Sequence, residues 1–134
     1  MITGVAHVCF IVSNLEASER FYCGQLGMQH AFDFKAADGR RTGMYILAGR
    51  RTFIEIFEGK VEAGGAGASF RHTCLEVDDF DATVATLRAR GVEVTDVKLG
   101  MDNSYQAWLK DPDGNAIELH GYTAKSWQAP FLAR

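Results

Sequence analysis

Short stretches of alternating apolar and polar residues run through the first half of the chain, and they predict strands with one buried face. Four such stretches occur, at 7–12 (HVCFIV), 28–36, 41–49 and 51–59. Residues 13–27 have the spacing of an amphipathic helix instead. Ser13 and Glu16 form a capping box at its start, and Gly27 suits its end. The first half therefore predicts the order βαβββ.

The second half repeats this order after a glycine-rich connection. Strand-like patterns occur at 70–77, 92–98, 105–110 and 115–122. Between the first two of them, residues 78–91 predict a helix with Asp78 or Asp79 as its N-cap and Gly91 as its stop. We therefore expect a single α+β domain over 1–134. Its expected parts are module one (about 4–58), a linker (59–69), module two (about 70–122) and a C-terminal tail (123–134).

Residue identities point to an internal duplication. His7 and His72 occupy the same place in the first strand of each module, and a cysteine follows each of them two residues later. Glu55 and Glu118 lie within the last strand of each module, at nearly the same distance from the histidine. Shared patterning rules explain matching apolar positions, but they do not predict His and Glu at equivalent places. Two copies of one βαβββ unit explain all of these matches.

The duplication predicts a metal-binding cleft. Residues two apart in a strand share a face, so both histidines and both glutamates should lie on the face away from the helices. Two modules side by side would form a curved mixed sheet whose concave face holds His7, Glu55, His72 and Glu118. Buried carboxylates are costly unless they are hydrated or bound to a cation. Imidazoles and carboxylates together suit one divalent metal ion per site: Zn, Ni, Co, Mn or Fe.

Composition narrows the class of protein. The chain is 47% hydrophobic and 23% charged, and no apolar run approaches the roughly 20 residues that a membrane helix needs. The net charge is −3 without a basic stripe, which argues against nucleic acid as a partner. The three cysteines show no CxxC spacing, as expected for reduced thiols. The start lacks a basic region, so we expect no secretory signal and a cytoplasmic location.

Several motifs together resemble one known family. Paired βαβββ modules, a His in each first strand, a Glu in each last strand, and the segments FYCGQLGM and DPDGNAIEL resemble the vicinal oxygen chelate superfamily. That superfamily comprises glyoxalases, bleomycin resistance proteins and dioxygenases. The resemblance covers about residues 4–122. It specifies the superfamily better than the reaction, because this fold hosts several chemistries.

The order His, Glu, His, Glu most resembles glyoxalase I. The resemblance implies that His7, Glu55, His72 and Glu118 are the metal ligands of a lyase or isomerase. It also implies proton transfer on a small hydroxy-carbonyl substrate, with Glu55 or Glu118 as the base. We expect a homodimer, and the sequence leaves open whether the four ligands come from one chain or from two.

Two positions depart from the glutathione-dependent glyoxalases. Those enzymes carry an Arg four residues after the first His and an Asn a few residues after the first Glu, and both help to hold glutathione. Ile11 and Gly59 stand at these places here. We therefore expect a substrate that is not bound to glutathione.

Other activities of the superfamily remain as alternatives. The segment DNSYQAWLKDPDG resembles the fosfomycin-type thiol transferases, with Lys98, Ser104 and Tyr105 as candidate anion contacts. Glu55 and Cys9 argue against that activity, because those enzymes use two His and one carboxylate and usually carry a Thr in place of the Cys. An extradiol dioxygenase is a further alternative, although a fourth protein ligand leaves little room for O₂. A metal-free, bleomycin-resistance-like binding protein would not need paired His and Glu.

Two further features are candidate parts of the site. His120 lies two residues after Glu118 and so on the same face of its strand. It would support the metal ligand or line the cleft, where it could contact substrate. The C-terminal tail has no counterpart in the first module, and Trp127 and Phe131 would pack over the cleft or against a second subunit.

Overall fold

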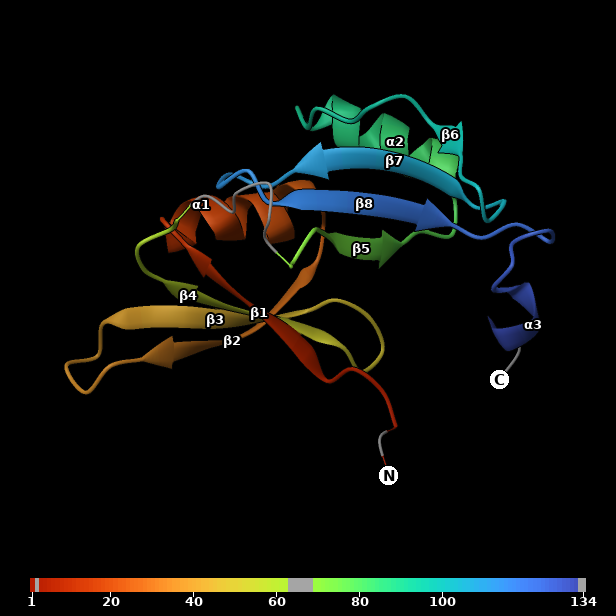
Figure 1. Ribbon diagram of the computed structural model, residues 1–134. Helices are drawn as coiled ribbons and strands as arrows, with labels where there is room; N and C mark the ends of the chain where they lie inside the picture. The colour runs from red at the N-terminus through yellow and green to blue at the C-terminus, as the bar shows by residue number, and fades with distance from the viewer. Residues whose placement is uncertain (2, 63–68, 133–134) are drawn as a thin grey trace. The chain divides into compact units, whose positions relative to one another are not determined.

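The computed structural model describes residues 1, 3–62 and 69–132. The chain divides into two compact units, Met1–Gly67 and Ala68–Arg134, and each unit carries one four-stranded sheet (Figure 1). The division between the units falls in the glycine-rich connection. Of the predicted linker, residues 63–68 lie outside the described residues.

Unit 1 contains one mixed sheet with the strand order β1-β4-β3-β2. β1 runs parallel to β4, and the β4–β3 and β3–β2 pairs are antiparallel. In chain order its elements are β1 (His7–Val12), α1 (Leu15–Glu19), the π-helix η1 (Arg20–Gln25), β2 (Gln29–Lys35), β3 (Arg41–Leu47) and β4 (Phe53–Glu58).

Unit 2 contains a second mixed sheet with the strand order β5-β8-β7-β6. β5 runs parallel to β8, and the other two pairs are antiparallel. Its elements are β5 (Thr73–Glu76), α2 (Phe80–Ala89), β6 (Lys98–Leu99), β7 (Tyr105–Lys110), β8 (Ala116–Gly121) and α3 (Ala129–Leu132). The two sheets have the same order of first, fourth, third and second strand, which confirms the predicted α+β fold of tandem βαβββ modules.

One face of each sheet is buried by apolar side chains, as the alternation predicted. In β1, Phe10 and Val12 are buried whereas His7, Cys9 and Ile11 are exposed. The described core of unit 1 includes Val12, Leu15, Tyr22, Met44, Ile46, Ile54 and Ile56, and that of unit 2 includes Phe80, Val84, Leu87, Ala107, Leu109, Ile117 and Leu119. The side chains of Glu55 and Glu118 therefore point away from these cores, because each alternates with buried neighbours along its strand.

The helices are short, and their starts follow local capping chemistry. The Oδ1 atom of Asn14 accepts a hydrogen bond of 2.7 Å from the Ala17 amide, so Asn14 is the N-cap of α1. The predicted capping box on Ser13 is wrong for this reason. Asp79 caps α2 as predicted, and Gly91 follows that helix at φ +80°. Among the described residues, no helix has both the length and the apolarity needed to cross a membrane.

The predicted strand at 92–98 is mostly absent, because only Lys98 and Leu99 pair as a strand. The Arg88 guanidinium, reaching from α2, donates to the backbone carbonyls of Val94 and Thr95. The Thr95 hydroxyl accepts from the Trp108 amide at 2.9 Å. Side chains thus replace part of the hydrogen bonding that a strand ladder would supply.

Strand β2 is one of the edge strands of its sheet, and its pairing with β3 has two irregularities in register, between His30 and Phe32 and between Phe34 and Lys35. The first irregularity turns His30 to the face of the sheet that packs on the helices, where it pairs with the buried Ile46. Phe32 pairs with Tyr45 on the opposite face, which we call the open face. A bulge of this kind inserts one residue and reverses the facing of those beyond it.

We expect Gly43→Ala to destabilise the fold by about 1–3 kcal/mol, because an added methyl group would overpack the sheet. A Cβ at Gly43 would lie 2.5 Å from the Ile56 carbonyl oxygen and 2.5 Å from the Phe57 ring. Gly24→Ala is the control, since a Cβ there meets no atom within 4 Å, and it should be neutral or stabilise the helix by about 0.5–1 kcal/mol. Urea unfolding measures both changes, and a Gly43→Ala midpoint at or above that of the unsubstituted protein would refute the prediction.

Candidate metal centre

In unit 1, His7 and Glu55 lie together on the open face of the sheet. The parallel pairing of β1 and β4 places Cys9 opposite Glu55 and His7 opposite Phe53. Nε2 of His7 is 3.6 Å from Oε2 of Glu55, and the glutamate side chain is only 19% exposed. The predicted first half of the ligand set is therefore assembled within this unit.

Tyr45 holds the other side of the His7 ring. Its hydroxyl oxygen is 2.8 Å from Nδ1 of His7, and Tyr45 is the register partner of Glu55 in β3. Desolvation, and after it the Glu55 carboxylate, raises the pKa of Tyr45. A phenol oxygen that accepts a hydrogen bond from Nδ1–H leaves the Nε2 lone pair free, as a metal ligand requires. The sequence analysis missed Tyr45, although the register that pairs it with Glu55 identifies it.

Aromatic rings surround this pair. Phe32 stacks on Tyr45 with ring centroids 4.8 Å apart, and Phe32 remains 47% exposed. Phe34 and Phe53 also contact the Tyr45 ring, and Phe57 contacts Phe34. We call these five residues the aromatic cluster. The open face of unit 1 thus offers flat apolar surface beside a single His–Glu pair.

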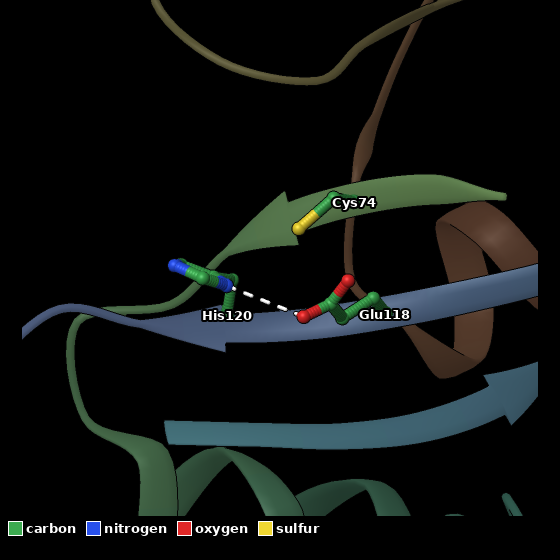
Figure 2. A group of neighbouring side chains, drawn as sticks. All are labelled: Cys74, Glu118 and His120. Atoms are coloured by element: carbon green, nitrogen blue, oxygen red, sulfur yellow. Dashed lines mark hydrogen bonds and ion pairs between the residues drawn. The ribbon is translucent and has the colours of Figure 1, made fainter. Parts of the chain in front are cut away.

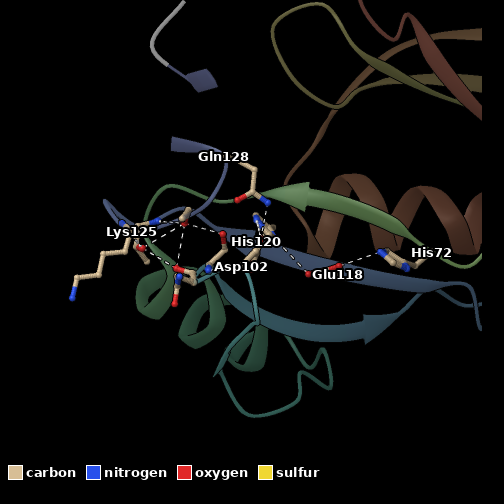
Figure 3. Close-up of polar contacts among 10 residues, drawn as sticks. His72, Asp102, Glu118, His120, Lys125 and Gln128 are labelled. Atoms are coloured by element: carbon tan, nitrogen blue, oxygen red, sulfur yellow. Dashed lines mark hydrogen bonds and ion pairs between the residues drawn. The ribbon is translucent and has the colours of Figure 1, made fainter. Parts of the chain in front are cut away.

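In unit 2, His72 and Glu118 form the equivalent pair. Nε2 of His72 is 3.0 Å from Oε2 of Glu118, whose side chain is 12% exposed (Figure 3). The His72 ring meets Trp108 edge-on at a centroid distance of 4.8 Å. The second half of the predicted ligand set is thus also brought together within its own unit.

His120 contacts the second oxygen of Glu118. Its Nδ1 atom is 3.3 Å from Oε1 of Glu118, while its Nε2 atom is 3.7 Å from Oδ2 of Asp102. Gln128 donates to the same Oδ2 atom at 2.6 Å. This hydrogen bond is the largest influence on Asp102 and lowers the pKa of its carboxyl. Figure 3 shows the resulting row of polar side chains, which runs from His72 through Glu118 to Gln128.

Cys74 lies beside Glu118 on the neighbouring strand. The two residues are register partners in the parallel β5–β8 pair (Figure 2). Cys74 is exposed at the surface, but partial desolvation of its thiol, followed by the negative charge of Glu118 and a hydrogen bond to it, raises the pKa of Cys74 to about 12. Cys9 is placed in the same way beside Glu55, and partial desolvation of its thiol, followed by that carboxylate, also raises the pKa of Cys9. Both thiols are therefore protonated at neutral pH.

The three candidate anion contacts have different surroundings. Lys98 is the register partner of Gln106 and so shares the face of Glu118. Ser104 is fully buried, and its hydroxyl hydrogen already goes to Ser126 at 2.8 Å. Tyr105 pairs with Gly121 on the helix side, against Phe80. The structure thus places Ser104 away from solvent and Tyr105 on the face opposite Glu118. The substrate contacts expected for Lys98, Ser104 and Tyr105 stay predictions.

The tail beyond β8 contacts the loop that carries Asp102. The Trp127 amide donates to the Asp102 carbonyl at 2.9 Å, and the Trp127 side chain stays 67% exposed. A hollow of about 470 Å³ lies between this tail and the open face of the sheet. Its lining includes Cys74, Asp102, Glu118, His120, Trp127 and Gln128. Phe131 is also exposed, and its predicted packing partner stays a prediction.

The donor set of each pair fits a divalent cation. Each unit offers one imidazole nitrogen and one carboxylate oxygen within 3.6 Å of each other, on the sheet face away from the core. In both pairs the carboxylate is less exposed than the imidazole, which favours a bound cation because desolvated carboxylates need compensation. Binding of one ion by all four residues stays a prediction.

Known proteins are similar to this chain in sequence. Residues 4–119 match the model of the Glyoxalase/Bleomycin resistance protein/Dioxygenase superfamily. A probable lactoylglutathione lyase of Vibrio parahaemolyticus is 32% identical over 124 residues, covering 86% of this chain and 88% of the relative. The metallothiol transferase FosB of Staphylococcus epidermidis is 30% identical over 131 residues, which cover 92% of this chain and 85% of the relative.

A solved structure has the same fold. TnmS3, an antibiotic binding protein from Streptomyces sp. CB03234, is similar with a TM-score of 0.75 and 29% identity. The similarity covers 91% of this chain and 98% of that one. With the family match and the paired βαβββ modules, it shows that the chain belongs to the glyoxalase/bleomycin resistance protein/dioxygenase superfamily.

Proposed function

We propose that this chain is a metal-dependent lyase or isomerase of the glyoxalase type, which transfers a proton on a small substrate with neighbouring oxygen atoms. The observation that carries the proposal is the repeated His–Glu pair, with nitrogen-to-oxygen distances of 3.6 Å in unit 1 and 3.0 Å in unit 2. Membership of the superfamily supports it. His7, Glu55, His72 and Glu118 are the proposed ligands of one divalent ion, Zn, Ni, Co, Mn or Fe.

A bound divalent ion would supply Lewis-acid stabilisation of the negative charge that develops on a substrate oxygen when a C–H proton leaves. The histidines would act as neutral nitrogen donors. Tyr45 would fix the tautomer of His7 through the 2.8 Å contact with Nδ1. The proton itself needs a carboxylate base within reach of the substrate.

Glu55 is better suited than Glu118 to be that base. Both oxygens of Glu118 face imidazoles, Oε2 toward His72 and Oε1 toward His120. Residue 57, which stands two positions after Glu55 as His120 does after Glu118, is a phenylalanine and offers no such hydrogen bond. Glu55 is therefore freer to turn toward a substrate carbon, and Glu118 is the more firmly held ligand.

The open face of unit 1 favours a substrate with an apolar part. The aromatic cluster lies next to His7 and Glu55, so a flat apolar group could stack on Phe32 while its oxygen atoms reach the site. Ile11 is exposed on the same face, where the glutathione-dependent enzymes carry an arginine. An apolar side chain there cannot pair with a carboxylate of glutathione.

A thiol transferase is the second candidate, favoured by the 30% identity to FosB over 92% of the chain. Two of the anion contacts that this activity would use are less favourable, because Ser104 is buried and Tyr105 faces the helix side of the sheet. The test is to incubate the protein with an epoxide and one of several small thiols. Protein-dependent consumption of the thiol would favour the transferase. Dioxygenase activity would require O₂ uptake, and a purely ligand-binding role would show neither reaction.

Replacing His7 tests the ligand set. Loss of a residue that only hydrogen-bonds to a metal ligand typically lowers metal affinity by about 10–100-fold. His7 is a proposed ligand itself, so His7→Ala should lower the affinity for the catalytic ion by more than that. Elemental analysis of stripped and reloaded protein measures the loss. His30→Ala is the control, because His30 lies on the helix side with Asp33 at 2.9 Å. Equal metal content in both variants and the unsubstituted protein would contradict the proposal.

Glu55→Gln and Glu118→Gln separate the two carboxylates. Glu55→Gln should lower kcat by about 100–10,000-fold, the usual contribution of a general base, and retain most of the metal. Glu118→Gln should chiefly weaken metal binding, with activity partly restored at high metal concentration. Turnover and metal titration are measured together, and the reverse pattern would assign the base to Glu118 instead.

The substrate expectation is tested with the hemithioacetal of methylglyoxal and glutathione. Because Ile11 and Gly59 replace the arginine and asparagine of the glutathione-dependent enzymes, its kcat/KM should stay low with nickel or zinc. Ile11→Arg should raise kcat/KM through KM, since it adds a partner for a carboxylate. Efficient turnover by the unsubstituted protein would overturn the expectation.

A further inference from the structure

The two modules differ at one position beside their glutamates. Cys9 and Glu55 are register partners in unit 1, just as Cys74 and Glu118 are in unit 2. Two residues beyond the glutamate, unit 1 has Phe57 and unit 2 has His120. Cys74 and Glu118 thus have the imidazole of His120 beside them, at a position where unit 1 has the phenyl ring of Phe57.

The three side chains converge on one point. One ligand atom from each of Cys74, Glu118 and His120 lies within 4.8 Å of the other two (Figure 2). Glu118 and His120 alternate with buried residues along β8, and so they share one face with Cys74 of β5. Atoms this close can reach one cation with small rotations of their side chains.

Polar residues lie behind His120 and support its ring. Nε2 of His120 is buried and makes no hydrogen bond, and Oδ2 of Asp102 faces it at 3.7 Å. Gln128 holds that carboxylate at 2.6 Å, and the Ser104 amide donates to its other oxygen. A carboxylate behind one ring nitrogen, with the other nitrogen directed at the donors, is the usual arrangement of a metal-binding histidine.

We propose that Cys74, Glu118 and His120 form a second metal site, for a thiophilic divalent ion such as Zn²⁺, Co²⁺ or Cd²⁺. Sulfur, nitrogen and oxygen donors together suit these ions. Binding replaces the thiol proton of Cys74, which passes to water. Three protein donors leave a position open, and the hollow beside them has room for a water molecule or a small thiol at that position.

The site does not depend on the proposed function, but it shares Glu118 with it. An ion held by Cys74 and His120 would engage the carboxylate from the side opposite His72. A thiophilic metal at this site would therefore alter how Glu118 is presented to the catalytic ion, and an excess of such a metal would inhibit the enzyme.

Co²⁺ is the probe, because a cobalt–thiolate bond gives an ultraviolet charge-transfer absorption that nitrogen and oxygen ligands do not give. Titration of the metal-stripped full chain should produce this band with one Co²⁺ per chain. Cys74→Ser and His120→Phe should abolish it, the second by giving unit 2 the residue that unit 1 has at position 57. Cys9→Ser should keep it, since no imidazole stands at the equivalent place.

The outcomes separate this site from the catalytic one. His7→Ala should keep the cobalt–thiolate band even where it abolishes activity, so failure of the proposed function leaves the band in place. Cys74 is exposed, so serine there should leave the thermal unfolding midpoint unchanged and can decide the result if His120→Phe unfolds. No band at saturating Co²⁺, a band that survives in Cys74→Ser, or one lost only in Cys9→Ser would overturn the proposal.

Discussion

The parallel pairing of the first and last strands of each module is the constraint on which the candidate site depends. His7 and Glu55 are far apart in sequence, as are His72 and Glu118, and only the β1–β4 and β5–β8 pairs bring them within 3.6 Å and 3.0 Å. A parallel pair needs a crossover connection, which α1 with two further strands provides in one unit and α2 with two further strands in the other. The placement of the candidate ligands therefore follows from the topology of the module.

The surroundings of the His–Glu pair differ between the two modules. In unit 1 the His–Glu pair lies beside the aromatic cluster, so its surroundings are largely apolar. In unit 2 the pair lies in a row of polar side chains that ends in the tail, with Asp102 and Gln128 behind His120. In our proposal, these unequal surroundings let Glu55 act as the base while Glu118 remains a metal ligand.

The sequence could predict whatever depends on periodicity and repetition. The strand faces, the module order and the two His–Glu pairs all follow from alternation and from matching positions in the halves. Long-range contacts could not be read in this way. The pairing of Tyr45 with His7 and of Asp102 with His120 depends on register and on loop conformation. The surroundings of Ser104 and Tyr105 could not be read either, because the tail buries Ser104 and the strand alternation turns Tyr105 away from Glu118.

The two irregularities in the β2–β3 pairing also affect how this protein can associate. An edge strand exposes unpaired amide and carbonyl groups, to which another chain could add a strand. The two breaks in the register of β2 interrupt that row of groups, and Asp33 in the strand is held by Arg41 at 2.7 Å. A regular intermolecular ladder along this edge is therefore disfavoured, which protects the module from edge-to-edge aggregation and directs any pairing of subunits to other surfaces.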